Sequence, residues 1–230
     1  MDFFSSLIDE VIALTSPLGG KSCPVGSPWA DAGHNQVILQ RDTAFELDGT
    51  GFNLITSGEI ADGITVIGDD LDQIRSDRRF ARICLVRLDN EEDEQKAYNL
   101  IKKAEYVKYH CFPDGYMMRT SSRTHKEVIR VAAKAVKDGI TFGKIGSLLI
   151  NKYKEIPAVR GVRVIFITDP DAPFGRIEEI AQKNSSIAET LNHVMNSVKF
   201  DCDTCNLKAV CDEVEGMKEL HFKTSMGGRN

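Results

Sequence analysis

Three cysteines near the C-terminus have the spacing of a metal site. Cys202, Cys205 and Cys211 fall within ten residues, in a chain of 230 residues that holds six cysteines. The two residues between Cys202 and Cys205 allow both thiolates to reach one metal ion or one edge of a cluster. Cys211 follows after five residues, so three thiolates would leave one coordination position open. The spacing therefore predicts a metal centre rather than three ordinary thiols.

Two residues could supply the fourth ligand of this centre. His221 follows Cys211 after nine residues, and Cys23 is followed by Pro24, a common neighbour of cluster cysteines. A closed zinc site usually has two separated pairs of ligands, whereas this segment has one pair and one single cysteine. We therefore expect an iron–sulfur cluster, with zinc as the alternative.

A second candidate site is a basic stripe. Lys126, Arg130, Lys134 and Lys137 have the spacing of one helix face, and residues 117–163 hold eleven Lys and Arg against three Asp and Glu, a net charge of +8. The rest of the chain then carries −13, since the whole chain carries −5. Such a face could bind a coenzyme phosphate or an acidic protein partner. The alternative is a solvated helix face.

Cysteine and histidine also occur together around the turn at residues 113–115. His110 and Cys111 precede this turn, and His125 follows it. A Cys/His pair can be catalytic when a third group orients the base, but the sequence shows no such group. We expect these three residues to lie in surface loops.

Apolar periodicity places the candidate residues on an α/β framework. Residues 162–167 are almost wholly apolar, which predicts a central strand covered on both faces. Thr124 and Glu127 have the spacing of a capping box and predict the start of a helix that ends near residue 138. The helices expected are 3–14, 91–109, 124–138, 141–156 and 174–198, and the strands expected are 37–40, 44–47, 52–56, 64–68 and 82–88, besides 162–167.

The order of these elements predicts a mixed α/β (α+β) fold, with a central mixed sheet flanked by helices. Three segments are expected. Residues 1–36 form an N-terminal helix and a Gly/Pro-rich linker, residues 37–198 form the α/β domain, and residues 199–230 form a small cysteine-rich metal-binding tail.

Composition excludes several classes of protein. Apolar residues make up 42% and charged residues 27% of the chain, which is ordinary for a globular protein. No segment approaches the roughly 20 apolar residues of a membrane span. The apolar N-terminus carries Asp2, Asp9 and Glu10, which a signal peptide would lack. With a net charge of −5, we expect a cytoplasmic protein that binds neither nucleic acid nor membranes.

Three segments resemble a known family. They are residues 61–68 with the following Asp70-Leu71-Asp72, residues 104–107, and residues 135–169. Together they resemble acetyl-CoA synthase, the beta subunit of the carbon monoxide dehydrogenase/acetyl-CoA synthase complex. The likeness is to its middle domain and to a shortened cluster-binding loop, and it extends over residues 37–221.

The resemblance implies roles for the C-terminal residues. In the family, four cysteines of this loop bind a [4Fe-4S] cluster. Cys202, Cys205 and Cys211 match the first three, and His221 stands at the fourth position. The family's Cys-Gly-Cys motif, which holds nickel, does not occur in this sequence, so a complete synthase is not expected from this chain alone.

The function implied is that of an accessory or electron-transfer component of anaerobic CO and acetyl-CoA metabolism. Its expected partner is an acidic electron carrier or a component of the carbon monoxide dehydrogenase/acetyl-CoA synthase complex, with coenzyme A as a candidate ligand. Two alternatives stay open: a subunit of a split synthase completed by another chain, and a zinc-stabilised interaction module. Whether the chain is an enzyme is left open.

Overall fold

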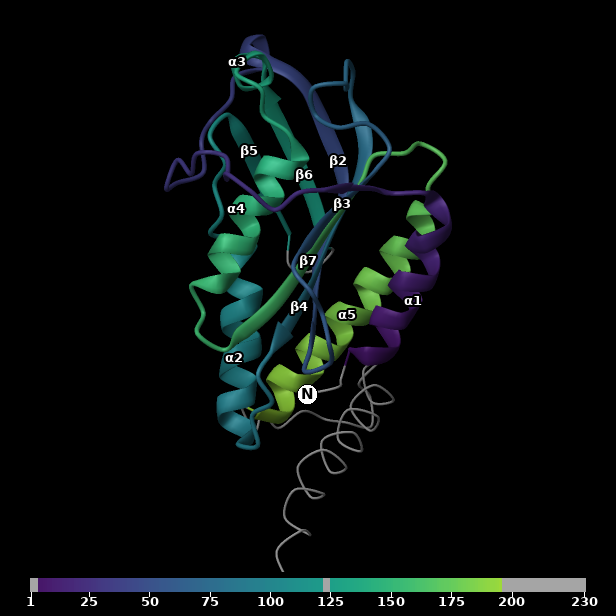
Figure 1. Cartoon of the computed structure of the whole chain (residues 1–230), viewed down its shortest axis with the longest axis vertical. Coiled ribbons are helices and arrows are strands. Elements are labelled where there is room, and N and C mark those ends of the chain that lie inside the picture. Colours follow the sequence, from purple (N-terminus) through teal and green to yellow (C-terminus); the bar gives the residue numbers. More distant parts are fainter. Residues whose placement is uncertain (1–3, 122–124, 196–230) are drawn as a thin grey trace, which may run out of the picture.

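A mixed sheet of seven strands lies at the centre of the computed structural model, which describes residues 4–121 and 125–195 (Figure 1). The strand order is β1-β3-β7-β4-β2-β6-β5. The pairs β2–β4 and β3–β7 are parallel, and the other neighbouring pairs are antiparallel. The strands are β1 (Lys21–Cys23), β2 (Thr43–Thr56), β3 (Gly63–Ile67), β4 (Arg78–Leu88), β5 (Tyr116–Thr120), β6 (Lys126–Ala132) and β7 (Val159–Ile167).

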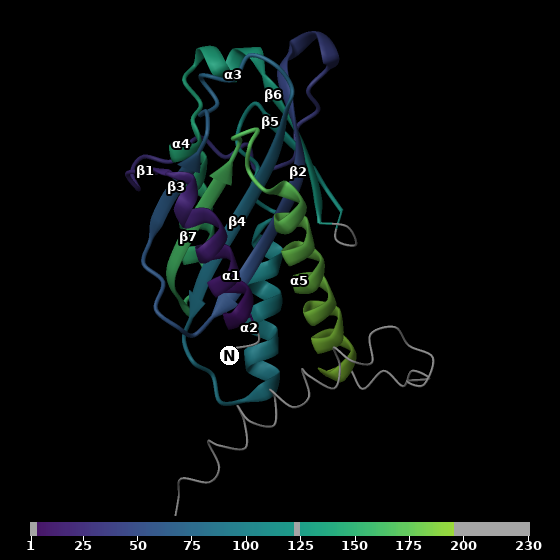
Figure 2. The ribbon, with the colours of Figure 1, turned by 90° about the vertical axis from the view of Figure 1, so that its right-hand side faces the viewer.

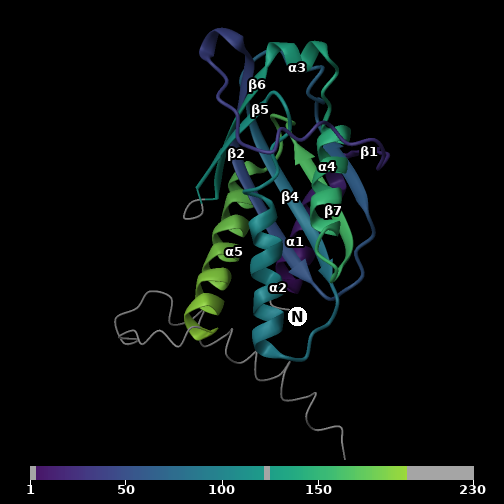
Figure 3. The same cartoon turned by 90° about the vertical axis from the view of Figure 1, so that its left-hand side faces the viewer.

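Helices cover both faces of the sheet, which confirms the predicted mixed α/β fold. Helices α1 (Ser5–Thr15) and α5 (Phe174–Met195) lie side by side on one face (Figure 2). Helices α2 (Glu94–Val107) and α4 (Phe142–Lys154) lie on the other (Figure 3). The short α3 (Ala133–Lys137) follows β6 directly. Among the described residues, no helix has the length and apolar composition that crossing a membrane requires.

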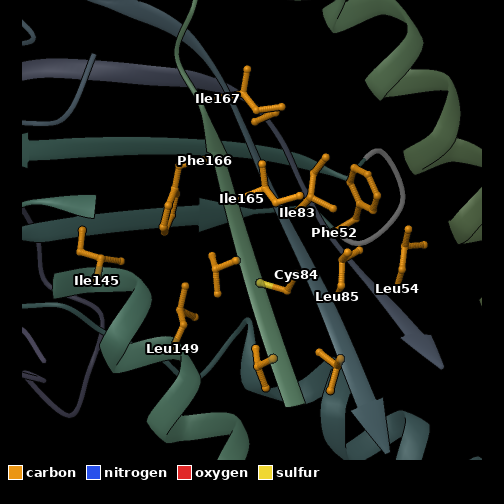
Figure 4. Packing of buried hydrophobic residues seen from close by; sticks show 14 of the residues in the cluster. Phe52, Leu54, Ile83, Cys84, Leu85, Ile145, Leu149, Ile165, Phe166 and Ile167 are labelled. Carbon is orange, nitrogen blue, oxygen red and sulfur yellow. The ribbon is translucent and has the colours of Figure 1, made fainter. Parts of the chain in front are cut away.

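The core is centred on the adjacent strands β4 and β7. Residues 80–86 of β4 are all buried, because helices cover both faces of the sheet at this point. Ile83 and Leu85 point to one face, while Cys84 points towards α4 on the other (Figure 4). The predicted central strand 162–167 is confirmed as part of β7.

The predicted helix over residues 124–138 is wrong. Residues 126–132 form strand β6, and only residues 133–137 are helical. Val128, Ile129 and Val131 are β-branched and favour a strand, and β6 pairs with both β2 and β5. Glu127 is buried inside the protein instead of capping a helix.

The predicted strands 44–47 and 52–56 are parts of one strand, the fourteen-residue β2. Gly49 and Gly51 lie inside β2 rather than in a turn. A Cβ atom on Gly49 would lie 1.6 Å from the carbonyl oxygen of Phe80, so the glycine allows the two backbones to approach closely. Residues 37–40 are not in a strand, and β5 was not predicted. Helix α5 continues through Asn184, which is buried.

Candidate functional site

A buried ion pair joins two strands in the core. Arg82 of β4 and Glu127 of β6 have side chains only 3% and 1% exposed. Arg82 Nε donates a hydrogen bond to Glu127 Oε1 (3.1 Å), and Arg82 Nη2 donates to Oε2 (2.9 Å). A two-pronged bond of this kind is the strong geometry for a guanidinium and a carboxylate. Since β2 lies between β4 and β6, the pair spans three strands.

Gly51 of β2 makes this ion pair sterically feasible. It lies opposite Arg82 in the parallel pairing of β2 and β4. A Cβ atom on Gly51 would lie 1.4 Å from Glu127 Oε2 and 3.0 Å from Arg82 Nη2. The space that a side chain would fill is therefore occupied by the two charged groups.

Other polar side chains gather around the ion pair. Arg82 Nη1 also donates to Cys84 Sγ (3.2 Å), and the Tyr153 hydroxyl donates to Asn53 Oδ1 (2.8 Å). Within the described part of the chain, the Tyr116 hydroxyl and Asn53 Nδ2 are buried without a hydrogen-bond partner.

A small cavity adjoins this cluster. Arg82, Lys108, Cys111, Tyr116 and Glu127 are among its lining residues. The centre of a water molecule has about 10 Å³ available there, which is about the room for one water. The cavity is therefore too small for an organic substrate.

The buried thiols are unreactive. Burial raises the pKa of Cys84, and burial raises the pKa of Cys111 to about 12. A thiol must be deprotonated to act as a nucleophile or as a metal ligand. Both groups therefore stay protonated near neutral pH, and neither thiol serves as a nucleophile or a metal ligand there.

The predicted surface positions of Cys111 and His125 are wrong. The two residues are 2% and 6% exposed, and only His110 is exposed. His125 has a φ of 50°, which is rare for a residue other than glycine. Both of its ring nitrogens are buried without a partner among the described residues. Burial, together with the nearby charge of Lys108, lowers the pKa of His125 to about 4.

The predicted basic stripe does not lie on one helix. Lys126 and Arg130 belong to β6, whereas Lys134 and Lys137 belong to α3. The expectation of a single helical face is therefore wrong, because the strand and the helix place successive side chains with different periods.

Most of these cations have acidic partners. Lys126 Nζ lies 3.3 Å from Asp48, and Arg130 Nε lies 2.6 Å from Glu46, both on β2. Lys134 pairs with Asp138. Three of the four cations of the predicted stripe are thus paired with carboxylates.

The predicted metal ligands Cys202, Cys205, Cys211 and His221 lie outside the described residues. Helix α5 ends at Met195, seven positions before Cys202. Cys23, the alternative ligand, is partly buried in β1, and burial, with Asp70 nearby, raises its pKa. Residues 4–121 and 125–195 contain no group of three or more His, Cys, Asp or Glu side chains that could hold a metal ion.

Comparison with protein families finds a match over most of the α/β domain. Residues 30–172, more than half of the chain, match the CO dehydrogenase/acetyl-CoA synthase complex beta subunit family. The chain belongs to this family. The match confirms the resemblance seen in the sequence and includes strands β2 to β7 with the Arg82–Glu127 pair. A search of curated proteins found no match.

The buried cluster around Arg82 and Glu127 was not predicted from the sequence. Glu127 was assigned to a capping box, and Arg82 to the predicted strand 82–88. Each of these two apolar strands has a charged residue at a core-facing position. Charged residues are almost never fully buried unless they are paired. That pattern could have predicted a buried ion pair between the two strands.

Proposed function

We propose that this chain is an iron–sulfur accessory component of the carbon monoxide dehydrogenase/acetyl-CoA synthase system. The observation that carries the proposal is the family match over residues 30–172, followed along the same chain by three clustered cysteines. In this proposal the α/β domain is the scaffold from which α5 leads to the cysteine segment. The chain acts with a protein partner, because the family it belongs to is a subunit of a complex.

The donor set fits such a cluster chemically. Cys202, Cys205 and Cys211 offer soft thiolates, which favour iron–sulfur clusters and zinc. His221 offers an imidazole, and histidine replaces cysteine in some clusters. A bound cluster would supply one-electron transfer. The protein's residues would set its potential through ligand type and charge.

Metal analysis of variants tests this proposal. The chain is purified without oxygen, and its iron and acid-labile sulfide are measured. Cys205→Ser should lose most of both, because one ligand of the centre is removed. Cys84→Ser changes a buried thiol that is distant in sequence from the cysteine cluster. It is the control and should retain both the iron and the sulfide. Equal iron in the wild type and in a Cys202/Cys205/Cys211 triple serine variant would contradict the proposal, and so would stoichiometric zinc without iron.

A second pair of variants identifies the fourth ligand. His221→Ala should lose iron if the imidazole binds the cluster, while Cys23→Ser should retain it. The opposite result would assign the fourth position to Cys23.

A further inference from the structure

A groove runs between the C-terminal ends of helices α2 and α4. Its volume is about 610 Å³, and it lies on the face of the sheet shown in Figure 3. Val107 and Ile156 provide apolar surface in the groove, and Tyr106 stands beside them. Tyr106 is 58% exposed, although it is a large aromatic residue on a helix whose other apolar side chains are buried or partly buried.

The exposed aromatic ring stacks on a neighbouring ring. The rings of Tyr106 and His110 are stacked, with their centres 3.4 Å apart and their planes inclined by 13°. His110 Nδ1 lies 3.0 Å from the carbonyl oxygen of Tyr106. An aromatic ring that is already ordered loses little conformational entropy on binding, which makes it a favourable anchor for a partner.

The groove also has cations available for binding. Lys102 and Lys103 are exposed, and neither has a carboxylate partner within the described residues; Lys102 Nζ lies 5.3 Å from the centre of the Tyr98 ring. In contrast, Lys152 is bound by Asp31 at 3.0 Å and by Glu155 at 3.4 Å. Lys102 and Lys103 lie before the last turn of α2, which holds no basic residue, so the effect of the helix dipole on them is weak. The dipole does not explain why an aromatic ring is exposed beside them.

We propose that this groove is the docking site for an acidic segment of a protein partner. Carboxylates of the segment pair with Lys102 and Lys103, and an apolar side chain between them packs against Tyr106 and Ile156. Charge complementarity selects an acidic partner over a basic one. The inference rests on the proposed function only in expecting a protein partner, and the site contains none of the proposed metal ligands.

Peptide binding to the full chain tests the docking site. The probe is a fluorescein-labelled pentapeptide with phenylalanine between two pairs of glutamates, and binding is followed by fluorescence polarisation. Lys102→Glu/Lys103→Glu should weaken binding by about tenfold or more, since two attractions become repulsions. Tyr106→Ser should weaken it without changing its salt dependence. Lys134→Glu/Lys137→Glu is the matched control, because it makes the same charge change on exposed α3, and it should bind as the wild type does.

Several results would overturn the docking site. One is equal binding by the wild type and the Lys102/Lys103 variant, with circular dichroism showing both folded. Another is equal binding of a probe in which lysines replace the glutamates. Tight binding of ATP but not of the peptide would assign the groove to a small anion, and a dimer lost only in the Lys102/Lys103 variant would assign it to a second copy. Iron content, measured in the same samples, reports separately on the proposed cluster.

Discussion

Arg82 and Glu127 are each tolerated in the core because the other is present. Replacing Glu127 by Gln leaves a buried guanidinium without its counter-charge and should lower the free energy of unfolding by about 3–5 kcal/mol. The double variant Arg82→Met/Glu127→Leu removes both charges and should regain most of that loss. Urea unfolding of the three variants and the wild type measures this. A double variant as unstable as Glu127→Gln would show that the ion pair itself, rather than mutual neutralisation, stabilises the core.

His125 should make stability depend on pH. Its pKa is about 4 in the folded chain, against an ordinary value near 6.5. As the pH falls below about 6.5 the unfolded chain binds the proton first, so the free energy of unfolding decreases until the folded chain also binds it near pH 4. The limit of this loss is about 3 kcal/mol, since one pKa unit corresponds to about 1.4 kcal/mol.

The variant His125→Asn isolates this contribution, because asparagine tolerates a positive φ and does not titrate. Its free energy of unfolding should change less between pH 7 and pH 4 than that of the wild type. The same slope in both proteins would mean that other groups cause the dependence.

At the scale of elements, strand β2 depends on a glycine. Gly51→Ala should lower the free energy of unfolding by about 1–3 kcal/mol or more, because the added Cβ would collide with the carboxylate of Glu127. Gly175→Ala is the matched control: no atom lies within 4 Å of its added Cβ, and it lies within α5. Gly175→Ala should leave the free energy of unfolding unchanged or raise it by up to about 1 kcal/mol. Thermal unfolding compares the two, and equal effects would contradict the assigned role of Gly51.

The sequence predicts elements well where the period of apolar residues is clear. Helices α1, α2, α4 and α5, and strands β3, β4 and β7, were expected from this pattern. The segment 124–138 failed because its apolar residues fit both a strand and a helix. Pairing with β2, about 80 residues earlier in the chain, decides in favour of the strand. Pairing between such distant segments cannot be predicted from the local sequence.

The same limit applies to the candidate site. Arg82 and Glu127 are 45 residues apart, and the burial of Cys111 and His125 depends on how distant segments pack. The cysteine spacing, in contrast, is local and can be interpreted without a structure. The metal site at these cysteines therefore stays a prediction that the sequence can make, whereas the buried cluster could not be predicted from local spacing.

At the scale of the whole molecule, the uneven charge of the sequence is partly balanced in three dimensions. Residues 117–163 carry +8, but five cations of this segment pair with carboxylates from elsewhere in the chain. Besides the partners on β2, Lys154 lies 3.1 Å from Asp62, and Arg160 pairs with Asp89. A run of one charge in a sequence therefore does not by itself mark an anion-binding face, and unpaired cations such as Lys102 and Lys103 are the better indicator.

The central claim is that the chain carries an iron–sulfur cluster bound by its C-terminal cysteines. Electron paramagnetic resonance of the anaerobically purified chain, reduced with dithionite, tests it most directly, because zinc has a closed d-shell, no redox chemistry and no signal. The account predicts a signal from a reduced cluster in the wild type that is lost in the Cys202/Cys205/Cys211 triple serine variant. A silent spectrum from a chain that contains zinc and no iron would contradict it.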